Sequence, residues 1–112
     1  MDKIAKYRNI IRETLLPYKK SHYAGSPDLK NEVILDNEND HYLVVTIGWD
    51  GEMPVRDCIF HLDIISGKIW VQEDNSDLDI ASILLEEGVP KSDIVLGFQS
   101  PLMRQHSMYA AA

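Results

Sequence analysis

The sequence predicts a single α+β domain, built from an antiparallel β-meander of four to five strands, an N-terminal helix and a second helix near residues 77–87. The chain has 112 residues, 45% of them hydrophobic, which suffices for one modest core. Apolar residues recur at helical spacing at the start of the chain and again after residue 77, and they alternate with polar residues in between. We therefore expect residues 1–112 to form one domain.

The first helix is predicted from an apolar stripe at helical spacing, formed by Ile4, Tyr7, Ile11 and Leu15. Asp2 suits the N-cap position, because its carboxylate can accept from a free amide of the first turn. Pro17 lacks a backbone donor, so the helix should weaken near Leu16. Residues 19–28 are then expected to form a connecting loop.

The first two strands are expected at residues 32–36 and 41–49. The four residues between them, Asn37 to Asp40, favour an antiparallel hairpin. Alternation in the second strand places His41, Leu43, Val45, Ile47 and Trp49 on one side and Tyr42, Val44 and Thr46 on the other. Asp50-Gly51, followed by Pro54, predicts a loop.

The next two strands are expected at residues 57–65 and 68–72, joined by a tight reversal at Ser66-Gly67. Alternation in the first of them places Cys58, Phe60, Leu62 and Ile64 on one side and Asp57, Ile59, His61, Asp63 and Ile65 on the other. Two further hairpins therefore extend the meander.

The second helix follows the meander, with Ser76 and Asp79 at capping-box spacing and Gly88 as its C-terminal stop. Residues 93–98 predict a short fifth strand, and residues 101–112 form a tail without an assigned structure. No stretch of about 18 apolar residues occurs, and the N-terminus is charged, so we expect a cytoplasmic protein. A single Cys58 fits that compartment, and its apolar neighbours favour a small buried hydrophobe over a nucleophile.

The charge is distributed unevenly along the chain, which carries a net charge of −7. Residues 1–30 hold seven Lys and Arg against three Asp and Glu, whereas residues 31–112 hold four against fifteen. DNA phosphates would be repelled by the acidic part, which disfavours a dedicated DNA-binding protein and permits a basic protein partner. Arg8 and Arg12 on the basic first helix are the candidate phosphate contacts, so any DNA contact should be indirect or weak.

His61 and Asp63 are the residues whose chemistry has to be weighed. They project from one side of a strand with Cβ atoms about 7 Å apart, which would suit two metal ligands. His22, His41 and His106 could add others, but no spacing such as His-x-x-x-His supports a site. We predict no catalytic residue, metal or cofactor, and we assign His61 and Asp63 to the lining of a strand. Together with two large aromatics they are the candidate interface residues: Trp49, His61, Asp63 and Trp70.

Four sequence blocks carry a resemblance to a known family: WDG (49–51), HLDIISGKIWVQ (61–72), EEGVPKSDIVLGF (86–98) and YAAA (109–112). Together and in this order they resemble the XisI family of fdxN element excision controlling factors, over nearly the whole chain. The resemblance implies an accessory protein of cyanobacterial type, associated with programmed excision of a DNA element during heterocyst differentiation. In that system a separate site-specific recombinase exchanges the strands, and XisI acts with a companion, XisH, which is nuclease-like in fold. The resemblance brings no catalytic residues.

The function expected from the sequence is therefore that of a non-enzymatic controlling factor that binds a XisH-like protein or the recombinase. One alternative is an antidote-like inhibitor of a nuclease-like XisH partner. Others are a direct DNA-binding factor that uses Arg8 and Arg12, and a small metal-dependent enzyme centred on His61 and Asp63. A homodimer is expected as well, because two helices can cover only one face of the sheet.

Overall fold

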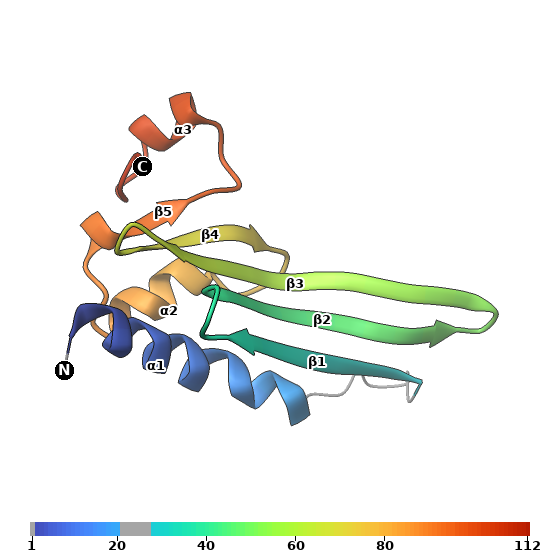
Figure 1. The fold of residues 1–112 in the computed structure, drawn as a ribbon. Helices are drawn as coiled ribbons and strands as arrows, with labels where there is room; N and C mark the ends of the chain where they lie inside the picture. The colour runs from blue at the N-terminus through green and yellow to red at the C-terminus, as the bar shows by residue number, and fades with distance from the viewer. Residues whose placement is uncertain (1, 21–27) are drawn as a thin grey trace.

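The computed structural model describes residues 2–20 and 28–112, which form one five-stranded sheet with two helices packed on one of its faces (Figure 1). The strands lie side by side in the order in which they occur in the sequence. They are β1 (Leu29–Asp36), β2 (His41–Asp50), β3 (Met53–Ile65), β4 (Lys68–Asp74) and β5 (Ile94–Leu96). The helices are α1 (Lys3–Leu15), α2 (Ile80–Glu86) and α3 (Pro101–Gln105), with 3-10 helices at Leu16–Lys20 and Lys91–Asp93. The predicted α+β class is confirmed.

Helix α1 begins and ends where the sequence predicts. The Asp2 carboxylate accepts from the Ala5 amide at 2.8 Å and caps the helix. Its apolar stripe is buried against the sheet and comprises Tyr7, Ile10, Ile11 and Leu15. The α-helix ends before Pro17, and the chain continues as a 3-10 helix to Lys20, so the predicted loop begins later than residue 19. Residues 21–27 of that loop lie outside the described residues.

Strands β1 to β4 form the predicted antiparallel meander. β1 starts at Leu29, three residues earlier than expected. The loop predicted at Asp50-Gly51 is a tight turn at Gly51 and Glu52, and it does not extend to Pro54, because β3 starts at Met53 and places Pro54 opposite Trp49. Proline is tolerated there because β3 pairs with β4 only from Phe60 onward, so its outer edge needs no donor at this point. The β2–β3 hairpin consequently projects beyond the rest of the sheet (Figure 1).

Two β-bulges interrupt the meander. Ile59 is an extra residue in β3, so that Cys58 lies opposite Val45 while Phe60 lies opposite Val44. Cys58 therefore shares a face with Val45 and not with Phe60, contrary to the alternation in the sequence, and its thiol is only partly buried. In β4 the extra residue is Gln72.

The last third of the chain returns through α2 to pair β5 with β4 in a parallel direction, so the fifth strand is not part of the meander. The N-cap of α2 is Asp79 and not Ser76, because the Asp79 carboxylate accepts from the Ser82 amide. Ser76 instead belongs to the preceding turn, where its hydroxyl accepts from the amide of Leu78. The tail forms α3 and then a bridge between Ala110 and β5.

The hydrophobic core lies between the two helices and one face of the sheet. The sheet residues buried there are Tyr42, Val44, Phe60, Leu62, Ile64, Ile69 and Val71. We call the opposite side of the sheet the open face; its side chains include His41, Leu43, Val45, Ile47 and Trp49 of β2, His61, Asp63 and Ile65 of β3, and Trp70 and Gln72 of β4. None of the described helices is long and apolar enough to cross a membrane.

An ion pair between Arg8 and Asp40 links α1 to the turn between β1 and β2. Arg8 Nε donates to Asp40 Oδ1 at 2.8 Å, and a terminal guanidinium nitrogen donates to Oδ2 at 3.1 Å. The Tyr42 hydroxyl also donates to Asp40 Oδ1, at 2.8 Å. The hydrogen bonds from Arg8 lower the pKa of Asp40 against the opposing effect of burial.

The free energy of unfolding should depend on pH through the ion pair of Arg8 and Asp40. Because the pKa of Asp40 is lower in the folded than in the unfolded protein, its stabilisation is present above the unfolded value and is lost as the pH falls through the folded one. We expect Asp40→Asn, in which Asn tolerates the positive φ of 58° at this position, to cost about 1–2 kcal/mol at neutral pH. In urea unfolding series the cost should shrink below about pH 4.

The exposed Glu38 of the same turn supplies the control, since Glu38→Gln removes an acid that holds no partner side chain among the described contacts. A cost of Asp40→Asn that stays constant between neutral and acid pH would show that the charge of Asp40 does not stabilise the fold.

Candidate functional site

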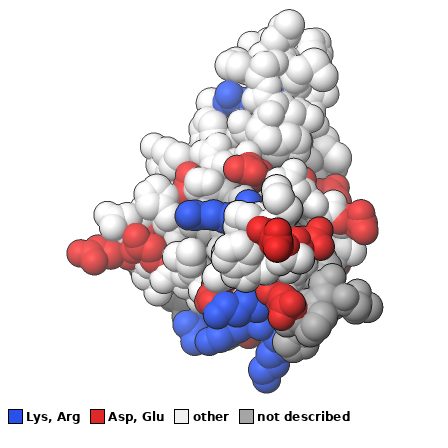
Figure 2. Space-filling model, turned by 90° about the vertical axis from the view of Figure 1, so that its right-hand side faces the viewer, with Lys and Arg blue, Asp and Glu red and all other residues white. Residues whose placement is uncertain are grey.

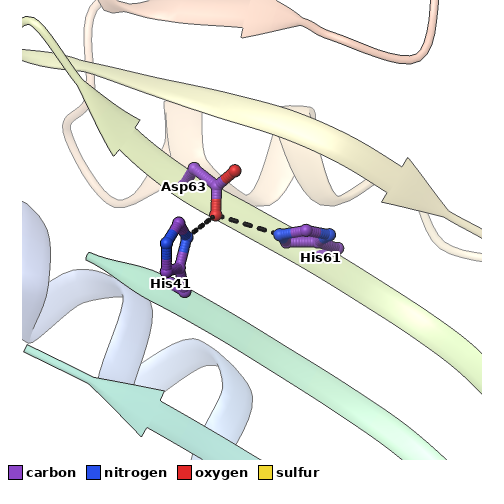
Figure 3. Close-up of side chains that lie close together, drawn as sticks. All are labelled: His41, His61 and Asp63. Atoms are coloured by element: carbon purple, nitrogen blue, oxygen red, sulfur yellow. Dashed lines mark hydrogen bonds and ion pairs between the residues drawn. The ribbon is translucent and has the colours of Figure 1, made fainter. Parts of the chain in front are cut away.

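Three side chains converge on the open face, from the start of β2 and the end of β3 (Figure 3). His41 lies directly opposite Asp63 in the β2–β3 register, and His61 precedes Asp63 by two residues on the same face. His41 Nδ1 lies 2.7 Å from Asp63 Oδ1, and His61 Nε2 lies 2.9 Å from the same oxygen. Two imidazoles from neighbouring strands thus meet at one carboxylate oxygen.

The carboxylate at the centre of this cluster is buried and held in place. Asp63 is only 6% exposed, although it lies on the open face. Its second oxygen accepts from Gln72 Nε2 at 3.2 Å, and Gln72 follows Trp70, the cross-strand partner of Asp63, by two residues along β4. The orientation of the carboxylate is therefore fixed from both sides.

The ion pairs of this cluster involve histidines and no lysine or arginine among the described residues. Within residues 2–20 and 28–112, the ion-pair partners of Asp63 are His41 and His61, and no Lys or Arg reaches it. The hydrogen bond to Asp63, followed by the attraction of its charge, raises the pKa of His41. His41 is largely exposed, whereas the side chain of His61 is 29% exposed.

These groups can bind a cation or move a proton. One ring nitrogen of His41, one ring nitrogen of His61 and a carboxylate oxygen of Asp63 all lie within 4.8 Å of one another. The sequence identified the pair of His61 and Asp63 and named His41 only as one of several histidines. The sequence did not show that β2 places His41 beside this pair. Predicting that contact requires the β2–β3 register, whereas the alternation of side chains within one strand gives only the face. His106 lies in the exposed C-terminal segment, and His22 lies outside the described residues.

The two tryptophans named as interface candidates differ in accessibility. Trp49, near the projecting end of β2, is 56% exposed on the open face. Trp70 is partly buried, and the guanidinium carbon of Arg104 lies 5.1 Å from the centre of its ring. Of the two, Trp49 therefore offers the larger surface to another molecule.

Comparison with known proteins places this chain in a family. The family model described as XisI protein matches residues 1–111. The chain belongs to the XisI family. No curated protein matches it.

Two solved structures of similar XisI proteins come from Anabaena variabilis ATCC 29413. A XisI-like protein is 37% identical, with 97% of this chain and 99% of that chain covered and a TM-score of 0.90. The fdxN element excision controlling factor XisI is 38% identical, with 99% of this chain and all of that chain covered and a TM-score of 0.85. The fold described above is thus that of XisI proteins.

The basic side chains of this XisI-family chain are most concentrated at the level of α1. Figure 2 shows Lys and Arg gathered near the lower edge, the level at which α1 lies in Figure 1, with others at mid-height and near the top, and acidic side chains scattered over the whole view. Of the two candidate phosphate contacts, Arg8 is engaged with Asp40, whereas Arg12 is exposed in the last turn of α1. A DNA contact through this helix would therefore depend on Arg12 more than on Arg8.

Proposed function

We propose that this XisI-family protein helps to control the excision of a DNA element and that it acts by binding another protein. The proposal is carried by the family match over residues 1–111, together with the likeness to a structure described as the fdxN element excision controlling factor XisI. The binding partner we propose is a XisH-like protein, with the site-specific recombinase as the other candidate. On this proposal the chain acts non-enzymatically.

The open face supports a protein-binding role. Large apolar side chains remain exposed on this face and at the projecting hairpin next to it: Ile34, Trp49, Met53 and Ile65. Soluble proteins seldom leave several such side chains uncovered on one surface unless another molecule covers them. Trp49 is the natural anchor, because tryptophan is enriched among the residues that dominate binding energy.

The acidic charge supports a basic partner. The net charge of −7 would attract a protein whose surface is adapted to DNA phosphates, and such attraction raises association rates. The interaction should weaken as salt rises, because exposed charges are screened over about 10 Å at 0.1 M ionic strength. Affinity that is indifferent to salt would argue against this electrostatic part of the proposal.

Co-expression tests the proposal directly. Tagged protein is expressed with the XisH-like protein encoded beside it, and the purified eluate is analysed by light scattering. We expect a defined hetero-complex, with Trp49→Ala weakening it at least about tenfold in a binding titration. The matched control is Leu16→Ala, which removes an exposed apolar side chain from the 3-10 helix after α1, on the opposite side of the sheet. A homodimer without a captured partner would contradict the proposal.

The same acidic surface favours inhibition as a second candidate function. An acidic protein can occupy the basic groove in which a nuclease binds DNA, so the chain could restrain a nuclease-like XisH partner. Expression of XisH alone should then harm cells, and co-expression of this chain should rescue them. Harmless expression of XisH would exclude the inhibitor role.

A further inference from the structure

The cluster of His41, His61 and Asp63 has the composition of a metal site. Two imidazole nitrogens and one carboxylate oxygen are the donor set with which proteins hold zinc and related divalent ions. We propose that these three side chains bind one divalent transition-metal ion at the open face. The sequence alone predicts no metal here, because the third donor comes from a different strand.

The first argument concerns charge. The carboxylate of Asp63 is 6% exposed, and burying a charge is costly unless an opposite charge or a metal accompanies it. Among the described residues, the side chains that hydrogen-bond to it are two imidazoles and the amide of Gln72. The charge of the carboxylate can be balanced by a proton on His41 or by a divalent cation that takes the place of that proton between the imidazoles.

The second argument concerns geometry. Metal–ligand distances of about 2.0–2.2 Å place the donor atoms of a tetrahedral site on the order of 3.3 Å apart. The two His–Asp63 distances are 2.7 and 2.9 Å, and all three donor atoms lie within 4.8 Å of one another. Small rotations of side chains are therefore sufficient, and the side chain of His41, which is 55% exposed, is free to make them.

The third argument concerns the support around the donors. Gln72 donates to the second oxygen of Asp63 and so orients the first oxygen toward the histidines. Such hydrogen bonds behind the ligands are a regular feature of protein metal sites. The backbone is also fixed, because His41 and Asp63 are direct partners in the β2–β3 ladder. The Asp63 carboxylate and the backbone of the site are thus held in place before any ion arrives.

The donor set also selects among ions. Imidazole suits zinc, copper, iron and nickel, whereas magnesium and calcium prefer oxygen ligands. Two of the three donors here are imidazoles, so magnesium should bind poorly. With three protein donors, at least one coordination position remains, which water or a group of another molecule could occupy.

Titration of the isolated protein tests this inference without reference to the proposed function. Metal-free protein, prepared with a chelator, is titrated calorimetrically with zinc sulfate and, separately, with magnesium chloride. We expect one zinc ion per chain and no saturable binding of magnesium. Cobalt chloride should give the visible absorption of a site that contains nitrogen and oxygen ligands.

Variants identify the donors. His41→Gln and His61→Ala should each weaken zinc binding at least about 100-fold, and because the His41 side chain is 55% exposed we expect His41→Gln to fold normally. Gln72→Leu removes the support behind Asp63 and should weaken binding about 10- to 100-fold. The matched control is His106→Gln, which removes an exposed histidine elsewhere and should leave the affinity unchanged.

Two results would overturn the inference. One is wild-type binding of zinc that is no tighter than that of His41→Gln, which would make the cluster a hydrogen-bonded ion pair and nothing more. The other is an equal loss in His106→Gln, which would indicate scattered binding to surface histidines. Neither result would bear on capture of a protein partner, so failure of this inference and failure of the proposed function can be told apart.

Discussion

Phe60→Ala is expected to lower the free energy of unfolding by about 3–5 kcal/mol. The Phe60 side chain is completely buried between the sheet and the helices, and its ring packs edge-on against Tyr18 with centroids 5.1 Å apart. Truncation removes apolar contact and leaves a cavity that neighbouring strands cannot close. Urea unfolding should show a lower midpoint with an unchanged slope.

The control for Phe60→Ala is Trp49→Ala, which removes a larger aromatic side chain from the open face. Because Trp49 is largely exposed, we expect its loss to change stability by no more than about 0.5 kcal/mol. Its effect should instead be seen in partner binding. Equal destabilisation by the two variants would mean that the open face is covered within the folded chain itself.

Gly48→Ala should cost at least about 2 kcal/mol of stability. Gly48 has a φ of +146°, and a Cβ atom there would lie 1.9 Å from the carbonyl oxygen of Asp28. That carbonyl accepts from the Trp49 amide, so it cannot move without breaking the hydrogen bond that ends the β1–β2 ladder. Thermal unfolding followed by circular dichroism should show a lower midpoint.

Gly51 provides the comparison for Gly48, because it also has a positive φ, of 63°, but a Cβ atom there would have open space around it. Gly51→Ala therefore tests the backbone conformation alone and should cost about 1 kcal/mol. If both variants lost the same stability, the close approach of Asp28 would contribute nothing, and conformational strain would account for both.

The elements set by local chemistry could be predicted from the sequence. Helix α1 is one example, since the Asp2 cap and the apolar stripe lie within a few residues of one another. The assignment of Tyr42 and Val44 to one face of β2, and of Trp49 to the other, also follows from alternation alone. These features require no knowledge of what the strand pairs with.

Features that depend on pairing between distant segments could not be predicted. The parallel direction of β5 follows from the path of α2 across the sheet, which the apolar pattern of residues 94–96 does not reveal. Arg8 and Asp40 are 32 positions apart in the sequence, so their ion pair could not be predicted. Because Arg8 is engaged with Asp40, fewer basic side chains of α1 are available to bind phosphate than its sequence indicates. The meeting of His41 with His61 and Asp63 could not be predicted for the same reason, since His41 comes from another strand.

The extra residue Ile59 decides which side chains meet at the site. The β2–β3 hairpin closes with Asp50 opposite Met53. If the register set by this turn continued without a bulge, His41 would lie opposite Leu62. Tyr42 would then oppose His61, and because cross-strand partners share a face, the imidazole would be driven beneath the helices. The extra residue Ile59 shifts the β2–β3 register by one position. It thereby keeps Tyr42 on the core face and places His61 and Asp63 together with His41 on the open face.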